Sequence, residues 1–91
     1  MGIKVIILHP SLQQLTHNLE LIGVNGHTVG ECLNHLVKQF PGLEKGLFDR
    51  YGQLLNYVCF FVNGKGAYPT NPARPLKDGD ELTISVLLAG G

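Results

Sequence analysis

The sequence predicts an α+β domain in which a mixed sheet of four to five strands packs on one main helix. Short stretches of alternating apolar and polar residues lie towards both ends of the chain, which is the pattern of half-buried strands. One longer stretch between them has its apolar residues at helical spacing. A chain of 91 residues has room for one hydrophobic core, so we expect residues 1–91 to form a single domain.

The first third of the chain predicts a hairpin with a wide loop. Residues 3–9 alternate in the manner of a strand whose second face is still partly apolar. Pro10 ends this strand, because proline has no N–H to donate to a sheet. Residues 11–17 read as a polar connection, and residues 18–24 alternate loosely as a second strand.

A capping box predicts where the helix begins. The Thr28 hydroxyl can accept a hydrogen bond from the third helical amide, while Glu31 reaches back to the N–H of Thr28 itself. Apolar residues then follow at helical spacing until Pro41 ends the run. We expect this stripe to face the sheet: Val29, Cys32, Leu33, Leu36, Val37 and Phe40.

The region after the helix predicts two further strands. Residues 43–56 carry mixed signals and leave a loop and a short helical turn as alternatives, although Leu43, Leu47 and Phe48 could cap the core. Residues 57–62 are the most β-prone stretch, and Asn63-Gly64 is a strong hairpin turn signal. We therefore expect a short fourth strand near residues 67–68. The prolines that follow exclude regular structure until Leu76.

The chain ends in a strand followed by two glycines. Residues 77–80 predict a turn, after which Leu82, Ile84 and Val86 alternate with polar residues. Beyond Leu88 the side chains shrink and then vanish, so we expect residues 88–91 to form a flexible tail. A Gly-Gly end can enter a channel too narrow for any side chain. The reactive group delivered there is the carboxylate of Gly91, an anion at neutral pH.

Composition and charge argue against several classes of protein. Seven Lys and Arg balance seven Asp and Glu, so we expect no nucleic-acid partner. No apolar run approaches the length of a membrane span, so we expect a cytoplasmic protein without a membrane partner. Cys32 and Cys59 lack the spacing of a zinc or iron–sulfur site, so we expect them to be reduced structural thiols. The four histidines are scattered along the chain, so we expect no metal site shared among them.

The predicted order of elements is that of the β-grasp, or ubiquitin-like, fold. Residues 76–82, together with Leu88-Ala89-Gly90-Gly91, resemble the ending of the ubiquitin-like sulfur carriers of the ThiS/MoaD group. Residues 28–33 resemble the start of the helix in that family, and residues 60–64 resemble its third strand and the following turn. The resemblance extends from one end of the chain to the other and is most specific at the C-terminus.

The resemblance implies that this chain carries sulfur on its C-terminal carboxylate. An ATP-dependent activating enzyme of the MoeB/ThiF type would adenylate Gly91, and Gly90 would give it access. A sulfur donor protein would then convert the acyl adenylate into a thiocarboxylate for a sulfur-accepting synthase. The chain would bind no cofactor and would not be an enzyme, but a protein co-substrate that is monomeric when free. It could also be the small non-catalytic subunit of a synthase such as molybdopterin synthase.

The phase of the strands predicts a docking face. If the odd-numbered apolar residues of the first strand face the helix, an apolar set points outward and would bind the partner proteins. This set comprises Ile6, Leu8, Cys59, Phe61, Ser85 and Leu87, joined by Leu88 and Ala89 of the tail. In the alternative, residues 43–56 cover part of the set.

Three functions remain open after the sequence has been read. The first is a sulfur carrier, for which the resemblance leaves the receiving pathway open. The second is a protein modifier conjugated through Gly91 to lysines. The third is a plain β-grasp interaction module in which the terminal glycines have no role.

Overall fold

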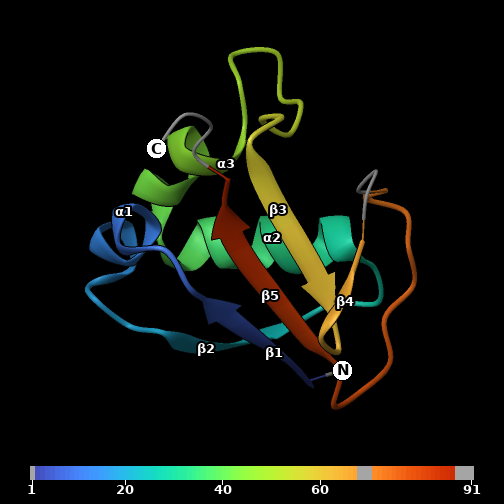
Figure 1. Ribbon diagram of the computed structural model, residues 1–91. Coiled ribbons are helices and arrows are strands. Elements are labelled where there is room, and N and C mark those ends of the chain that lie inside the picture. The colour runs from blue at the N-terminus through green and yellow to red at the C-terminus, as the bar shows by residue number, and fades with distance from the viewer. Residues whose placement is uncertain (1, 68–70, 88–91) are drawn as a thin grey trace.

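The computed structural model describes residues 2–67 and 71–87 and has two layers, a sheet and the helices that cover one of its faces (Figure 1). The sheet has five strands in the order β2-β1-β5-β3-β4. Their bounds are Gly2–Ile7 for β1, Leu21–Asn25 for β2, Val58–Val62 for β3, Lys65–Gly66 for β4 and Glu81–Val86 for β5. The β1–β5 pair is parallel and the other three pairs are antiparallel, which confirms the predicted mixed sheet.

The two terminal strands lie side by side in the middle of the sheet. In the parallel register of β1 and β5, Val5 lies opposite Leu82 and Ile7 lies opposite Ile84. All four side chains are buried, because they point to the face that the helices cover. Burying both ends of the chain in one sheet means that β5, which leads to the C-terminus, has a fixed strand on either side.

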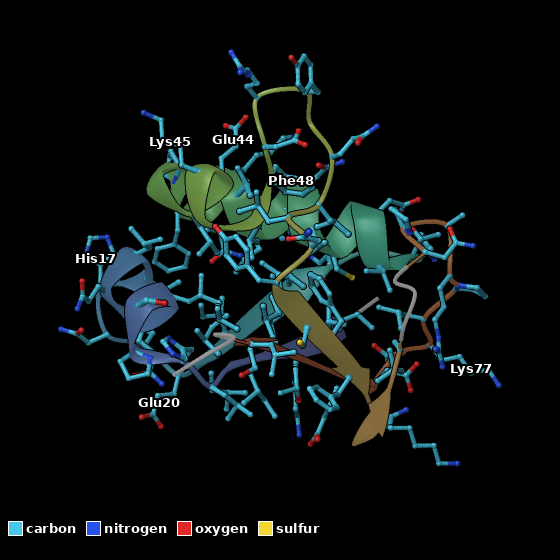
Figure 2. The ribbon with its side chains drawn as sticks, turned by 45° about the horizontal axis from the view of Figure 1, so that its top comes forward. His17, Glu20, Glu44, Lys45, Phe48 and Lys77 are labelled. Atoms are coloured by element: carbon cyan, nitrogen blue, oxygen red, sulfur yellow. The ribbon has the colours of Figure 1, made fainter. Side chains whose placement is uncertain are left out.

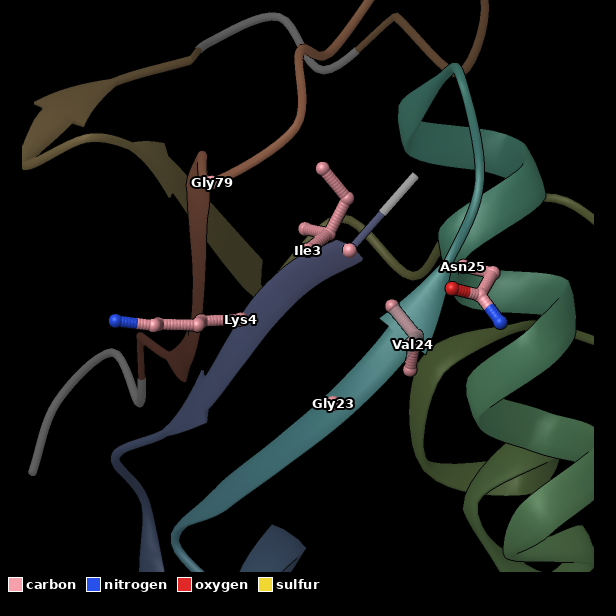
Figure 3. Close-up of a pocket in the computed structure, with 7 residues that line it drawn as sticks. Ile3, Lys4, Gly23, Val24, Asn25 and Gly79 are labelled. Atoms are coloured by element: carbon pink, nitrogen blue, oxygen red, sulfur yellow. The ribbon is translucent and has the colours of Figure 1, made fainter.

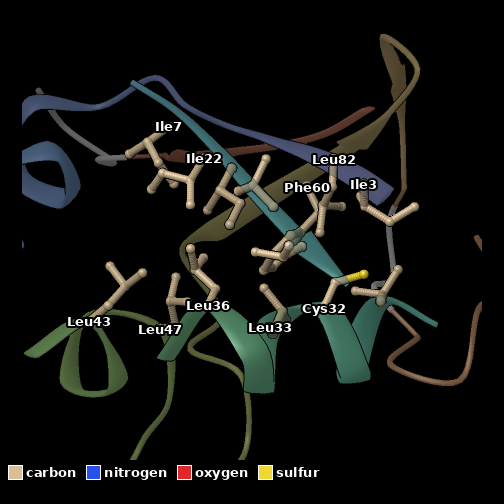
Figure 4. Close-up of a cluster of buried hydrophobic side chains, with 14 of the residues drawn as sticks. Ile3, Ile7, Ile22, Cys32, Leu33, Leu36, Leu43, Leu47, Phe60 and Leu82 are labelled. Atoms are coloured by element: carbon tan, nitrogen blue, oxygen red, sulfur yellow. The ribbon is translucent and has the colours of Figure 1, made fainter. Parts of the chain in front are cut away.

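The main helix α2 runs from Val29 to Gln39 along the covered face of the sheet (Figures 1 and 4). As predicted, the Thr28 hydroxyl caps it by accepting from the Glu31 amide at 3.2 Å. The Glu31 carboxylate, however, accepts from the N–H of His27 at 3.0 Å and not from that of Thr28, so this half of the prediction is wrong. Thr28 is extended, and beside its bridge to Pro75 the His27 carbonyl accepts from the Leu76 amide, so His27 is fixed where its own N–H meets the Glu31 carboxylate.

The hydrophobic core lies between α2 and the inner face of the sheet (Figure 4). Five of the six residues predicted for the helix stripe are buried, and Val37 is half-buried. Leu43 and Leu47 extend the core beyond the end of α2 and are fully buried. They show that the segment after the helix belongs to the same core, as the sequence suggested.

The segment left open by the sequence consists of helical turns followed by a loop. A 3-10 turn, η2, spans Pro41–Leu43, and a one-turn helix, α3, spans Glu44–Leu47. Phe48 then bridges to Leu54 and closes a short loop between them. Phe48, Leu54 and Leu55 are partly buried against the core, so the loop is attached to the domain at its base.

The structure differs from the sequence predictions at four places. Residues 11–17 are not a polar connection but form α1 (Pro10–Gln13) and the 3-10 turn η1 (Gln14–Thr16), because Leu12 and Thr16 are buried. This helical segment takes His9 as its N-cap, so β1 ends at Ile7 and β2 begins only at Leu21. The fourth strand lies at Lys65–Gly66, directly after the Asn63-Gly64 turn, whereas residue 68 lies outside the described residues.

Candidate functional site

The C-terminal exit is the first part of the site. Strand β5 ends at Val86, and the N–H of Leu87 then donates to the carbonyl of Tyr57 at 2.7 Å. The exit therefore lies at the end of the sheet where β3 begins, beside the loop that follows α3 (Figure 1). The sulfur-carrying position and its neighbours predicted from the sequence lie outside the described residues: Leu88, Ala89, Gly90 and Gly91.

The outward face of the sheet is the second part of the site. Ile6 and Phe61 both lie opposite Thr83, so the three side chains form one row across β1, β5 and β3. Cys59 lies opposite Ser85 in the neighbouring row. Apart from Thr83, these residues were predicted to point outward, and all five are half-buried at the surface.

Leu8 and Leu87 complete the predicted outward set. Leu8 is 56% exposed and Leu87 is 67% exposed, and each lies one residue beyond the end of its strand. All six outward positions predicted from strand phase are therefore on the uncovered side or at its end.

Sequence reasoning missed two members of this face. Thr83 lies at its centre, and its phase with Ser85 could have indicated it. Leu21 on β2 lies opposite Ile6 and is 60% exposed. It could be placed only once the register of the hairpin was known. We call the full set the outward patch: Ile6, Leu8, Leu21, Cys59, Phe61, Thr83, Ser85 and Leu87.

The leucines and the phenylalanine of segment 43–56 pack into or against the core. Leu43 and Leu47 lie on the α2 side, below the strands in Figure 4, and the half-buried Leu55 packs against the same cluster. The alternative in which this segment covers the docking face does not hold for these side chains. The outward patch therefore offers an apolar surface to solvent.

The chemical groups on the outward patch suit binding rather than catalysis. The patch holds apolar side chains, two hydroxyls and the half-buried free thiol of Cys59. The other thiol, Cys32, is buried in the core, and its pKa is raised by burial and further by the neighbouring Glu31 carboxylate. In the described ranges 2–67 and 71–87, no group of three or more His, Cys, Asp and Glu is arranged to hold a metal ion.

Two of the surface hollows border the sheet or α3. The smaller, of about 310 Å³, lies at the paired ends of β1 and β2 and is lined by Ile3, Lys4, Val24, Asn25 and three glycines (Figure 3). The larger, of about 880 Å³, lies beside α3, and we call it the α3 groove. Its lining includes Lys45, Phe48, Arg50 and Tyr57. The carbonyl of Tyr57 also accepts the hydrogen bond from the Leu87 amide, so this groove borders the C-terminal exit.

None of the helices in the described part of the chain is long and apolar enough to cross a membrane.

Comparison with known proteins rests on structure. Neither a protein-family model nor a curated protein sequence matches this chain. SAMP1 from Haloferax volcanii matches with a TM-score of 0.86 and 23% identity over 100% of both chains. A chain of the BexX/CysO complex from Amycolatopsis orientalis matches with a TM-score of 0.83 and 24% identity, over 98% of this chain and 99% of that one. The fold is the ubiquitin-like β-grasp fold.

A more distant match supports the same β-grasp assignment. A chain of the complex between subunits 1 and 2 of molybdopterin-converting factor from Helicobacter pylori matches with a TM-score of 0.64 and 21% identity, over 100% of both chains. The predicted β-grasp fold is confirmed for the described residues 2–67 and 71–87. In this β-grasp domain, α2 occupies one face of the sheet and the outward patch lies on the other.

Proposed function

We propose that this chain is a sulfur carrier protein that is activated at the carboxylate of Gly91. The observation that carries the proposal is the central position of β5, which brings the chain to Leu87 beside an uncovered apolar face, four residues before the end of the sequence. The β-grasp matches to CysO and to molybdopterin-converting factor support it, as does the resemblance of the C-terminal sequence to the ThiS/MoaD group.

The chemistry explains why a terminal glycine suits this role. A carboxylate is a poor electrophile, so one of its oxygens first attacks the α-phosphorus of ATP and pyrophosphate leaves. A sulfur nucleophile from the donor protein then attacks the carbonyl carbon of the acyl adenylate, and AMP leaves with the electron pair of the broken C–O bond. If that nucleophile is the outer sulfur of a persulfide on a donor cysteine, the product is an acyl disulfide. A thiol of the partner then attacks the donor cysteine's sulfur, forms a disulfide with it, and releases the thiocarboxylate of Gly91. These steps take place in the partner's active site, which makes this chain a co-substrate.

Docking through the outward patch is needed to offset the cost of ordering the tail. Holding four residues in a channel costs roughly 4 to 8 kcal/mol at about 1 to 2 kcal/mol per residue. The glycines have no side chains with which to recover this free energy. We propose that an activating enzyme of the MoeB/ThiF type and a sulfur-accepting synthase bind the outward patch around Phe61 and Thr83. The CysO complex with BexX and the paired subunits of molybdopterin-converting factor are precedents for such protein partners.

A protein modifier is the second candidate function. The match to the small archaeal modifier protein 1 of H. volcanii favours it. The adenylated Gly91 would then be attacked by a lysine amine of another protein, giving an isopeptide bond. The two functions share the first chemical step and differ in the nucleophile that follows.

The proposal is tested by measuring the intact mass of the protein. We would incubate it with ATP, a purified MoeB/ThiF-type enzyme of the source organism and a sulfide source. A gain equal to the mass difference between sulfur and oxygen, localised to the C-terminal peptide, is the expected result. A variant that lacks Gly90 and Gly91 is the control and should gain nothing. Lysine adducts in cells would favour the modifier, and normal function of the truncated variant would favour a plain interaction module.

A further inference from the structure

A short loop beside the C-terminal exit has a well-defined conformation. Phe48 and Leu54 bridge at its base, and the amide of Asp49 donates to the carbonyl of Gln53 at 2.8 Å. The Asp49 carboxylate accepts from the amides of Tyr51 and Gln53 at 2.8 and 3.0 Å. Gly52 has a φ of 79°, a left-handed backbone conformation that glycine adopts without the steric cost a side chain would bring. We call residues 48–54 the tip loop.

The tip loop presents an arginine and a tyrosine to solvent. Tyr51 is 77% exposed, and the guanidinium carbon of Arg50 lies 5.5 Å from the centre of its ring, within the range of a cation–π contact. Tyr and Arg are enriched among the residues that dominate binding energy at protein interfaces. The backbone that carries Tyr51 is held by hydrogen bonds within the turn, so little conformational entropy is lost when the ring binds a partner. The loop is therefore preorganised for a contact.

The position of the tip loop ties it to the C-terminal exit. Tyr57 lies three residues after the loop, and its carbonyl accepts a hydrogen bond from the Leu87 amide. Both residues lie at the end of the sheet where β3 begins. Residues 88–91 can span at most about 14 Å at roughly 3.5 Å per residue. A protein that takes the terminal carboxylate into its active site must therefore approach this end of the domain closely, where the tip loop projects (Figure 1).

We propose that the tip loop is a second docking element, separate from the outward patch, for the enzyme that adenylates Gly91. This inference rests on the proposed function. The partner surface that fits it carries a carboxylate for Arg50 and an apolar slot for the ring of Tyr51, next to the entrance of the channel that receives the tail.

Charges of both signs lie around the tip loop. The carboxylate of Asp49 is held by two backbone amides of the loop itself. Lys45 lies on the adjoining α3 groove and adds a second cation on this side, with Glu44 beside it (Figure 2). The lining of the α3 groove thus holds two cations and two carboxylates, so the proposed ion pair is a local one between the exposed Arg50 and a carboxylate at the rim of the partner's channel.

The experiment measures pyrophosphate release by the MoeB/ThiF-type enzyme as the concentration of this protein is varied. The test variants are Arg50→Ala, Tyr51→Ala and the double substitution. Lys77→Ala is the matched control for losing one surface cation, since Figure 2 shows Lys77 far from α3. Gln14→Ala, at an exposed position of η1, is the control for truncating an exposed side chain outside both docking elements. The melting temperature of every variant should equal that of the wild type.

The expected result is a rise in KM of roughly 30-fold for the double variant with kcat unchanged, because a docking contact contributes equally to the bound ground state and the transition state. The two controls should keep the wild-type KM. An unchanged KM in the double variant, a fall in kcat alone, or an equal rise for Lys77→Ala would overturn the loop proposal and leave the carrier function standing. No turnover of the wild-type protein would overturn both.

Discussion

The backbone N–H of Leu87 donates a 2.7 Å hydrogen bond to the carbonyl of Tyr57. Within the part of the chain that the structure describes, it is the hydrogen bond nearest the C-terminus. It extends the pairing of β5 with β3 by one residue beyond the Val58–Val86 pair. Since both partners are backbone groups, the position from which the tail departs is set by strand register and not by the nature of the Leu87 side chain.

Replacing Gly90 with valine should block delivery of the terminal carboxylate without changing the fold. A β-branched side chain one residue before the carboxylate would hold the reacting oxygen away from the α-phosphorus of ATP. We expect kcat/KM for adenylation to fall by roughly 100-fold, the loss typical of a small misplacement of reacting groups. Gly23→Val is a matched control, because a Cβ at this β2 position meets no atom within 4 Å. Wild-type turnover of Gly90→Val would contradict the channel argument.

Phe61→Asp should separate folding from partner binding. Phe61 lies on the outward face beside Thr83 and is half-buried, so a carboxylate there can still reach water. We expect an unchanged melting temperature and a loss of affinity of roughly 30-fold for the activating enzyme, the scale of an interface hot spot. Titration calorimetry measures it, with Ala73→Asp as the control for adding one carboxylate at an exposed position of the loop before β5. Unchanged affinity would remove the outward patch as a docking face.

Asp80 should make the stability of the domain depend on pH. Its carboxylate accepts from the Lys77 amide at 2.8 Å and from the Asn63 side chain at 3.0 Å, and these two bonds lower its pKa, the first most strongly. A group whose pKa is lower in the folded state stabilises that state above the pKa of the unfolded chain. This contribution is lost as the pH falls through the lowered pKa of the folded protein.

Urea unfolding of the wild type and of Asp80→Asn tests this prediction. At neutral pH the wild type should have the larger free energy of unfolding. The difference should shrink as the solution is acidified below the ordinary range of an aspartate. Glu20→Gln, at an exposed acid before β2, serves as the control for removing one negative charge. A difference between Asp80→Asn and wild type that stays constant with pH would refute the assignment.

The two thiols should differ in reactivity while the protein is folded. Cys32 is buried in the core, and burial raises its pKa, so little of it is present as the reactive thiolate. Cys59 is half-buried on the outward face. A disulfide reagent should therefore label Cys59 first and reach Cys32 only on unfolding, as peptide mass analysis would show. Cys59→Ser should abolish labelling of the folded protein. Labelling of Cys32 at a comparable rate would contradict its buried position.

Local patterns predicted most of the fold because each depends on a few neighbouring residues. The Thr28 cap, the helical stripe ending at Phe40 and the Asn63-Gly64 turn all follow from local geometry, and the structure confirms them. The helical turns at Pro10–Thr16 were missed because they are stabilised by burial of Leu12 and Thr16, and that contact is made with distant parts of the chain.

The docking face could be predicted only in part for the same reason. Strand alternation alone placed Ile6, Phe61 and Ser85 on the outward side. The inclusion of Leu21 required the register between β2 and β1, which no local pattern specifies. The tip loop was not predicted, because the relation of Tyr51 to the C-terminal exit depends on the pairing of Tyr57 with Leu87.

The sequence by itself determined that this chain is one α+β domain, which of its faces are apolar, and that it ends in two glycines without side chains. Those properties are local, since they depend on composition and on the period of side chains along the backbone. Only the tertiary structure decided that β5 lies between β1 and β3 and that its exit lies beside the tip loop. Such neighbours are set by burying β1 and β5 together in one core, a long-range contact that no short stretch of residues encodes.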